Sequence, residues 1–105
     1  MCRFWVLVLI LLLLPDPAFA ADITVTQSHM AFDADHITIH SGDTIVFKNK
    51  DNFPHDIQIG DMYDEAVDLG FQQPNIDYRY RFHEAGTYTI RCSLHKMMKL
   101  TIRVE

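Results

Sequence analysis

Apolar and polar residues alternate along most of the chain after residue 22, and this two-residue period is typical of half-buried β-strands. The alternation is clear in seven short segments: 23–26, 36–40, 44–48, 55–60, 76–82, 88–92 and 98–104. In one of them a single face carries Ile76, Tyr78, Tyr80 and Phe82. The pattern predicts an all-β domain built as a two-sheet antiparallel sandwich of about seven strands.

Residues 62–70 interrupt this pattern. Asp64, Glu65 and Asp68 break any clean alternation there, and we expect either a helical turn or an acidic loop. Elsewhere the strands are separated by turn residues, such as Ser41-Gly42-Asp43 and Glu84-Ala85-Gly86. No internal repeat or low-complexity tract is visible, so the pattern predicts one domain.

The first twenty residues follow a different pattern. Arg3 precedes an unbroken apolar run over residues 4–14, and Ala18-Phe19-Ala20 offers small residues at a cleavage site. As a helix this run would span roughly 16 Å, about half of a ~30 Å hydrocarbon core, so a retained membrane anchor is the weaker alternative. We expect residues 1–20 to be a secretory signal peptide cleaved near Ala20, and residues 21–105 to be a periplasmic domain free of the membrane.

Cleavage would remove Cys2 and leave Cys92 as the only cysteine of the domain. An unpaired cysteine in an exported protein forms an intermolecular bond, reacts, or binds a metal. His95 and Met98 follow within six residues, and His55 is a candidate second imidazole from another strand. A thiolate, two imidazoles and a weak axial thioether form the ligand set of blue-copper electron-transfer sites.

Strand parity separates the two neighbouring methionines. Met98 shares the parity of Leu100 and Ile102 and is expected to point inward, whereas Met97 shares the parity of Lys99 and is expected to point outward. Met98 is therefore the predicted axial ligand. Zinc is an alternative for one thiolate and two imidazoles, but the thioether argues against it.

The charge narrows the class of partner. The full chain has a net charge of −5. The predicted domain keeps this value, because cleavage of the leader would remove one basic and one acidic residue, Arg3 and Asp16. An acidic surface argues against binding to nucleic acid or to an anionic membrane. It suits a partner protein with a basic docking face.

Taken together, the motifs resemble those of the cupredoxins, the small blue-copper proteins, and most of all the amicyanin and plastocyanin-like group. The resemblance is carried by Ser41-Gly42-Asp43-Thr44, Phe47-Lys48-Asn49-Lys50-Asp51, Phe53-Pro54-His55 and Gly86-Thr87-Tyr88-Thr89-Ile90-Arg91-Cys92, followed by the short Cys-x-x-His-x-x-Met ending. It implies a Greek-key β-sandwich with one type 1 copper ion bound by His55, Cys92, His95 and Met98. It also implies that electrons pass through a partly exposed His95 within an apolar patch. Phe53, Pro54 and Leu94 are the candidate members of this patch.

Asp56 departs from the family pattern, which usually has Asn after the first histidine ligand. That amide ties the two ligand loops together, and a carboxylate cannot donate a hydrogen bond in its place unless it is protonated. A negative charge here would also favour Cu(II) over Cu(I). We expect Asp56→Asn to raise the reduction potential.

Four histidines lie outside this ligand set: His29, His36, His40 and His83. We expect them to be solvated surface residues, and a second, weaker copper site at His29 and Met30 stays open.

The resemblance favours a monomeric one-electron carrier that exchanges electrons with redox partner proteins. The alternative is a copper-handling protein that serves copper tolerance or delivery to another cuproprotein. A metal-free adhesion sandwich would leave Cys92 and its neighbours unexplained, and enzymatic activity is not expected because no further ligand cluster is visible.

Overall fold

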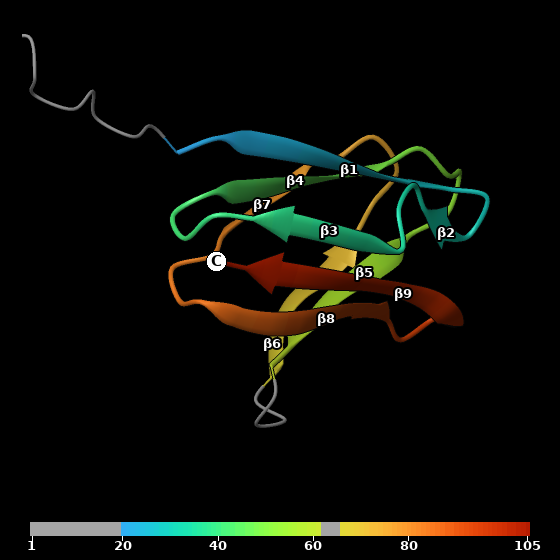
Figure 1. Cartoon of the computed structure of the whole chain (residues 1–105). Helices are drawn as coiled ribbons and strands as arrows, with labels where there is room; N and C mark the ends of the chain where they lie inside the picture. Colours follow the sequence, from blue (N-terminus) through green and yellow to red (C-terminus); the bar gives the residue numbers. More distant parts are fainter. Residues whose placement is uncertain (1–19, 62–65) are drawn as a thin grey trace, which may run out of the picture.

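The computed structural model describes residues 20–61 and 66–105. Within these ranges the chain forms nine strands and no α-helix, so the all-β prediction is confirmed (Figure 1). Nothing in these ranges forms a helix long and apolar enough to cross a membrane. Residues 1–19, most of the predicted leader, lie outside the described residues. The strands are β1 (Asp22–Ser28), β2 (Ala31–Phe32), β3 (His36–Ile39), β4 (Thr44–Asn49), β5 (His55–Gly60), β6 (Ala66–Gln72), β7 (Tyr78–Arg81), β8 (Gly86–Cys92) and β9 (His95–Val104).

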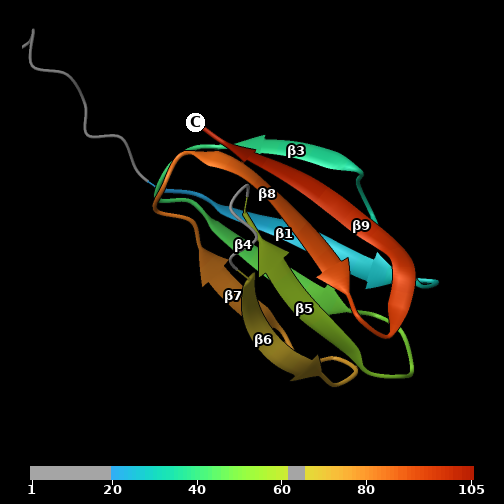
Figure 2. The ribbon, with the colours of Figure 1, turned by 90° about the horizontal axis from the view of Figure 1, so that it is seen from below.

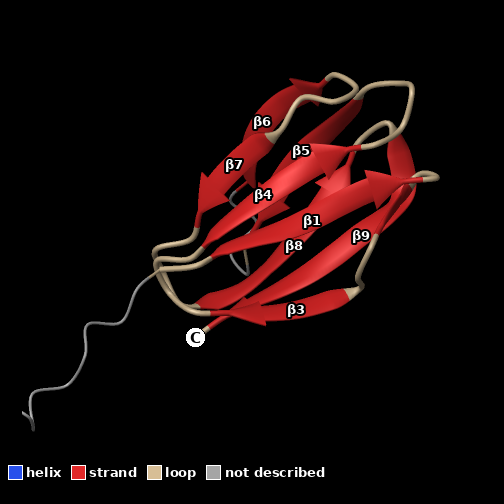
Figure 3. Ribbon diagram, turned by 90° about the horizontal axis from the view of Figure 1, so that it is seen from above, coloured by secondary structure: helices blue, strands red, loops and turns tan. Residues whose placement is uncertain are grey.

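The strands form two sheets that pack face to face as a sandwich (Figure 3). One sheet has the order β2-β1-β4-β7, and the other has the order β3-β9-β8-β5-β6. Most neighbours are antiparallel, but β1 pairs with β4 in parallel and β3 pairs with β9 in parallel. The predicted two-sheet sandwich is confirmed, but these two pairs are parallel where antiparallel pairing was expected, because alternation within a strand carries no information on the direction of its neighbour.

The core between the sheets consists of the inward residues that the alternation predicts. The side chains with no exposed surface include Ile45, Phe47, Ile57, Ile90, Leu100 and Ile102. Ile76 is an exception, since it is 50% exposed. It was expected on the inward face with Tyr78, but β7 begins only at Tyr78, so Ile76 lies in the preceding loop.

Both strands that the pattern missed lie at sheet edges. β2 is two residues long, and β6 occupies residues 66–72, where a helical turn or loop was expected; residues 62–65 of that segment lie outside the described residues. An edge strand has one neighbour and can carry charges, so Asp68 disturbs the alternation without preventing the strand. Gly70, with φ +84°, adds a local irregularity and donates its N–H to Asp68 Oδ1 at 2.8 Å.

The loops with the predicted ligands meet at one end of the sandwich. The β8–β9 hairpin, the β4–β5 connection and the end of β1 lie together there, whereas the C-terminus lies at the opposite end (Figure 2). β9 begins at His95, earlier than expected, and Cys92 pairs directly with His95 across the hairpin. This pairing leaves Ser93 and Leu94 as the connecting residues and makes the ligand loop tight.

Candidate metal site

The four predicted ligands come from three strands of one sheet. His55 is the first residue of β5, Cys92 is the last of β8, and His95 and Met98 belong to β9. The side chains of His55, Cys92 and Met98 are buried, each at most 2% exposed, and His95 is half-buried. Met98 points inward and Met97 is 96% exposed, so the parity prediction for their directions is confirmed.

His55 and Cys92 are in direct contact. His55 Nδ1 lies 3.7 Å from Cys92 Sγ, and the His55 and His95 rings have centroids 5.1 Å apart. A nitrogen and a sulfur bound to one tetrahedral ion at about 2.0 Å and 2.3 Å would be roughly 3.5 Å apart. The observed separation of the first pair is therefore close to that of two ligands of a common ion.

The contact between His55 and Cys92 does not by itself form a complete coordination shell. Within residues 20–61 and 66–105, no three side chains among His, Cys, Asp and Glu are arranged as a metal site. Met98 is part of the same buried cluster as Cys92. The structure thus brings the four residues to one end of the fold, and their assignment as ligands stays a prediction.

The Cys92 sulfur is buried and has two polar neighbours at the start of β5, the His55 ring and the Asp56 N–H. Burial raises the pKa of the Cys92 thiol, and hydrogen bonds from backbone N–H groups, that of Asp56 first among them, oppose the increase. The Asp56 N–H points to Sγ at 3.4 Å. A bound metal ion would stabilise the thiolate that burial disfavours, so this sulfur suits a metal ligand better than a free anion.

Asp56 links the two ligand loops, although not in the way that the sequence suggested. Its carboxylate accepts hydrogen bonds from Ser93 N (2.6 Å) and Ser93 Oγ (2.5 Å). Burial raises the pKa of Asp56, but hydrogen bonds from Ser93 and the Cys92 thiol outweigh this effect and leave it below the ordinary value. The carboxylate does not donate, as expected, and the tie between the loops is formed with Ser93 as the donor and Asp56 as the acceptor.

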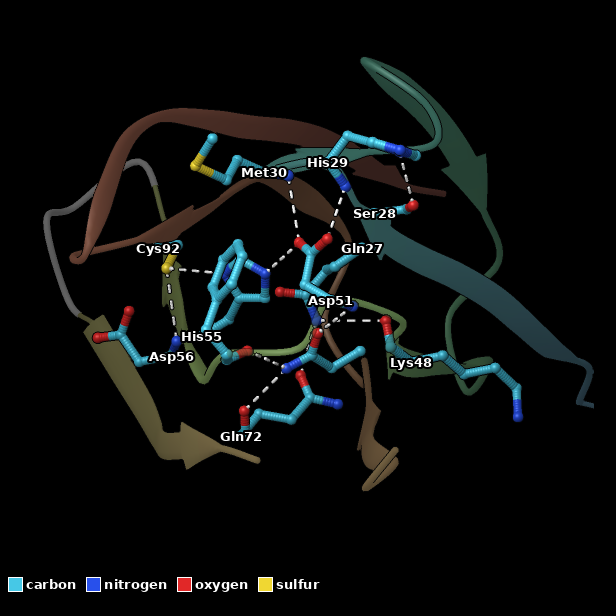
Figure 4. A network of polar contacts seen from close by, with 12 residues as sticks. Gln27, Ser28, His29, Met30, Lys48, Asp51, His55, Asp56, Gln72 and Cys92 are labelled. Carbon is cyan, nitrogen blue, oxygen red and sulfur yellow. Dashed lines mark hydrogen bonds and ion pairs between the residues drawn. The ribbon is translucent and has the colours of Figure 1, made fainter. Parts of the chain in front are cut away.

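A second carboxylate lies on the opposite side of the His55 ring. Figure 4 shows the ring between Cys92 and Asp51, with Asp51 Oδ2 at 2.7 Å from His55 Nε2. Burial raises the pKa of Asp51, but hydrogen bonds from His55 and from the backbone N–H groups of Met30 and His29 bring it below the ordinary value. The sequence analysis gave Asp51 no role, since four residues along a loop do not indicate contact.

Buried amides hold the β4–β5 connection in place. Asn49 donates to Phe53 O (3.0 Å) and to Gln72 O (3.1 Å), and its Oδ1 accepts from Asp51 N (2.9 Å). Gln72 in turn accepts from Gln27 Nε2 at 2.7 Å. These three amide side chains are at most 1% exposed. Sequence reasoning missed them because the three residues lie on separate strands, β1, β4 and β6.

The outer side of the site is apolar and exposed. The Phe53 ring contacts the His55 ring at 5.3 Å and the His95 ring at 5.4 Å between centroids. Phe53 is 37% exposed and Leu94 is 47% exposed, with Pro54 half-buried. His95 thus lies at the boundary between the buried ligands and solvent, as the resemblance implied. By contrast, His29, His36, His40 and His83 are exposed, as predicted.

Comparisons with known proteins agree with this chemistry. Residues 19–105 match the model of the copper-binding proteins of the plastocyanin/azurin family. A chloroplastic plastocyanin of Fritillaria agrestis is 31% identical over 81 residues, which cover 68% of this chain and 49% of the plastocyanin. The amicyanin of Paracoccus denitrificans is 27% identical over 85 residues, which cover 79% of this chain and 65% of the amicyanin. The chain therefore spans between about half and two thirds of the length of these relatives.

Solved structures match over a similar part of the chain. An oxidised amicyanin variant is 27% identical with a TM-score of 0.73, covering 80% of this chain and 82% of that protein. A copper-containing nitrite reductase from Thermus scotoductus is 29% identical with a TM-score of 0.72, but only 22% of that larger protein is covered. The likeness to the reductase is thus limited to a fraction of its length.

Proposed function

Because this chain belongs to the plastocyanin/azurin family of copper-binding proteins, the cupredoxins, we propose that it is a periplasmic one-electron carrier and not an enzyme. The ion is one type 1 copper, held by His55, Cys92, His95 and Met98. The observation that carries the proposal is the buried contact between His55 Nδ1 and Cys92 Sγ at 3.7 Å. It joins two predicted ligands that lie 37 residues apart in the sequence, at the end of the sandwich where His95 reaches the surface.

Three of the proposed ligands have a stated part in electron transfer. Copper, when bound, supplies one-electron exchange between Cu(II) and Cu(I). Cys92 and His55 hold their donor atoms in a frame of strands, which limits rearrangement between the two oxidation states and favours fast transfer. His95, half-buried beside Phe53, is the route by which the electron arrives from a reduced partner protein and leaves for an oxidised one.

The proposed location follows from the first twenty residues, whose short apolar run and small residues before Ala21 are typical of a secretory leader. Export also suits the single cysteine of the domain. Cys92 is free and buried, so a metal can protect it from forming a disulfide with another chain. The acidic net charge of −5 suits a redox partner with a basic docking face.

The site is tested by adding Cu(II) to the purified protein. We expect one equivalent to bind and to give the strong visible absorption of a thiolate-to-copper charge-transfer band. Cys92→Ser should abolish this band, because it removes the thiolate. Met97→Leu is the matched control, since it alters an exposed thioether two residues from His95, and it should keep the colour. A wild-type protein that binds Cu(II) and stays colourless would contradict the proposed site.

Copper handling is a second candidate function, and the exposed thioethers favour it. Met97 is 96% exposed and Met30 is 52% exposed, and thioethers are soft ligands suited to Cu(I). Electron transfer predicts a reversible voltammetric wave and fast self-exchange, together with slow loss of copper. Handling predicts the opposite balance, namely ready transfer of the ion to a competing apo-protein. Measuring both rates on the same copper-loaded sample separates the two functions.

A further inference from the structure

Asp51 joins the His55 ring to a turn of the other sheet. We propose that Asp51 is a positioning residue, which fixes His55 with Nδ1 toward the Cys92 sulfur and lowers the reduction potential of the bound copper. The inference rests on the proposed function for its effect on the potential. Its first part, the orientation of the ring, is a property of the chain alone.

The two nitrogens of the His55 ring face different partners. Nδ1 lies 3.7 Å from Cys92 Sγ, and Nε2 lies 2.7 Å from Asp51 Oδ2 (Figure 4). A carboxylate can only accept a hydrogen bond, so in a neutral ring the proton must be on Nε2. Nδ1 then keeps its lone pair for a metal ion, and the ring cannot rotate without losing its partner.

The carboxylate of Asp51 is itself held by a strained turn. The β1–β2 hairpin turns through His29 and Met30, which both have φ +56°, a region that residues other than glycine rarely adopt. Both of their N–H groups point to the carboxylate: His29 N lies 2.7 Å from Oδ1, and Met30 N lies 3.1 Å from Oδ2. The turn thus presents two donors that orient both oxygens.

The backbone of Asp51 is fixed as firmly as its side chain. Its N–H donates to Asn49 Oδ1 at 2.9 Å, and Asn49 is 1% exposed. The Asp51 side chain is 9% exposed, so the carboxylate is shielded from water. A fixed negative charge separated from the metal by one imidazole stabilises the more positive Cu(II) state over Cu(I). The potential is therefore expected to rise when this charge is removed.

The test compares Asp51→Asn with a control that removes the same charge far from the site. Asp22 suits this purpose because it is exposed, pairs with Arg79, and begins the seven-residue β1, whose other end leads to the turn. It thus lies about 20 Å away along the strand. In copper-loaded protein, we expect Asp51→Asn to shift the potential upward by several times the shift of Asp22→Asn while keeping the charge-transfer band. Equal shifts in the two variants would overturn the proposal.

A second measurement needs no copper. In the ¹⁵N spectrum of histidine-labelled apo-protein at alkaline pH, we expect the His55 proton on Nε2 in the wild type and a mixture of the two ring forms in Asp51→Ala, which removes the acceptor. An unchanged ring form in the variant would overturn the positioning role. If the wild type gives no coloured copper complex, the proposed function fails, and this spectrum still tests Asp51.

A variant that keeps the charge covers the case in which Asp51→Asn does not fold. Asp51→Glu retains a carboxylate on a longer side chain, so it preserves the acceptor for His55 Nε2. We expect Asp51→Glu to keep the proton on His55 Nε2. Its reduction potential should lie closer to that of the wild type than to that of Asp51→Asn. Loss of the Nε2 form in a folded Asp51→Glu variant would contradict the proposal.

Discussion

Individual polar side chains decide how the predicted ligands are supported. The sequence indicated His55, Cys92, His95 and Met98 by residue type, spacing and parity, and the fold brings them to one end. No sequence pattern indicated a role for Ser93, which donates to Asp56 through both its backbone N–H and its hydroxyl group. A hydrogen bond of this kind depends on the meeting of two loops 37 residues apart, so no local pattern predicts it.

The Asp56 substitution predicted from the sequence keeps its sign. Asp56→Asn removes a negative charge next to Cys92, and its side-chain oxygen can still accept one hydrogen bond from Ser93. We expect the reduction potential to rise, because Cu(II) loses more electrostatic stabilisation than Cu(I). Voltammetry of copper-loaded wild type, Asp56→Asn and the surface variant Asp22→Asn measures the effect. A fall in potential, or a shift no larger than that of Asp22→Asn, would contradict it.

The two strands that the alternation missed, β2 and β6, both lie at a sheet edge, although the edge strands β3 and β7 were predicted. β8 and β9 show a clear alternation, since one face of each is buried, as Ile90, Leu100 and Ile102 illustrate. β2 and β6 have a single neighbour each, so their sequences are less constrained. The pattern of apolar residues therefore reveals these two edge strands poorly, whereas β3 and β7 keep a visible alternation.

The contribution of the buried face of β9 to the free energy of unfolding can be measured by making the same Leu→Ala substitution at a buried and at an exposed position. Leu100 has no exposed surface, and Leu100→Ala should lower the free energy of unfolding by about 2–5 kcal/mol through lost burial and a residual cavity. Leu94 is 47% exposed, and Leu94→Ala should change it by less than about 0.5 kcal/mol. Denaturant unfolding of the apo-proteins gives both values. Similar losses for the two variants would show that β9 does not form the core described.

At the scale of the whole molecule, contacts at the end opposite the candidate site join β1 to the turn before β4. Asp43 is 6% exposed, and its carboxylate accepts from Ala21 N and from His40 N, both at 2.9 Å. The Thr44 N–H donates to Ala21 O at 2.9 Å. These bonds set the register in which β1 enters the sheet beside β4, a parallel pairing that the alternation did not reveal.

Asp43 gives the fold a pH dependence of known sign. Hydrogen bonds from the backbone of Ala21 and then of His40 hold the pKa of Asp43 below its ordinary value of 3.8. Its contribution to stability is therefore complete above pH 3.8 and is lost as the pH falls through the lower folded value. We expect the wild type to unfold at a higher temperature than Asp43→Asn at neutral pH, with the difference shrinking in acid. Thermal unfolding of both proteins across this range measures it, and a difference that grows in acid would contradict the assignment.

The sequence by itself determined the strand-rich class and the identity of the candidate ligands, because side-chain periodicity and ligand spacing are properties of neighbouring residues. Only the tertiary structure decided which strands run parallel, where the edge strands lie, and how Asp51 and Asp56 contact the ligand loops. Asp51 meets the turn at His29 across 22 residues of sequence, and Asp56 meets Ser93 across 37. Such contacts form only when distant loops reach the same end of the sandwich, and that convergence is set by how the two sheets are assembled.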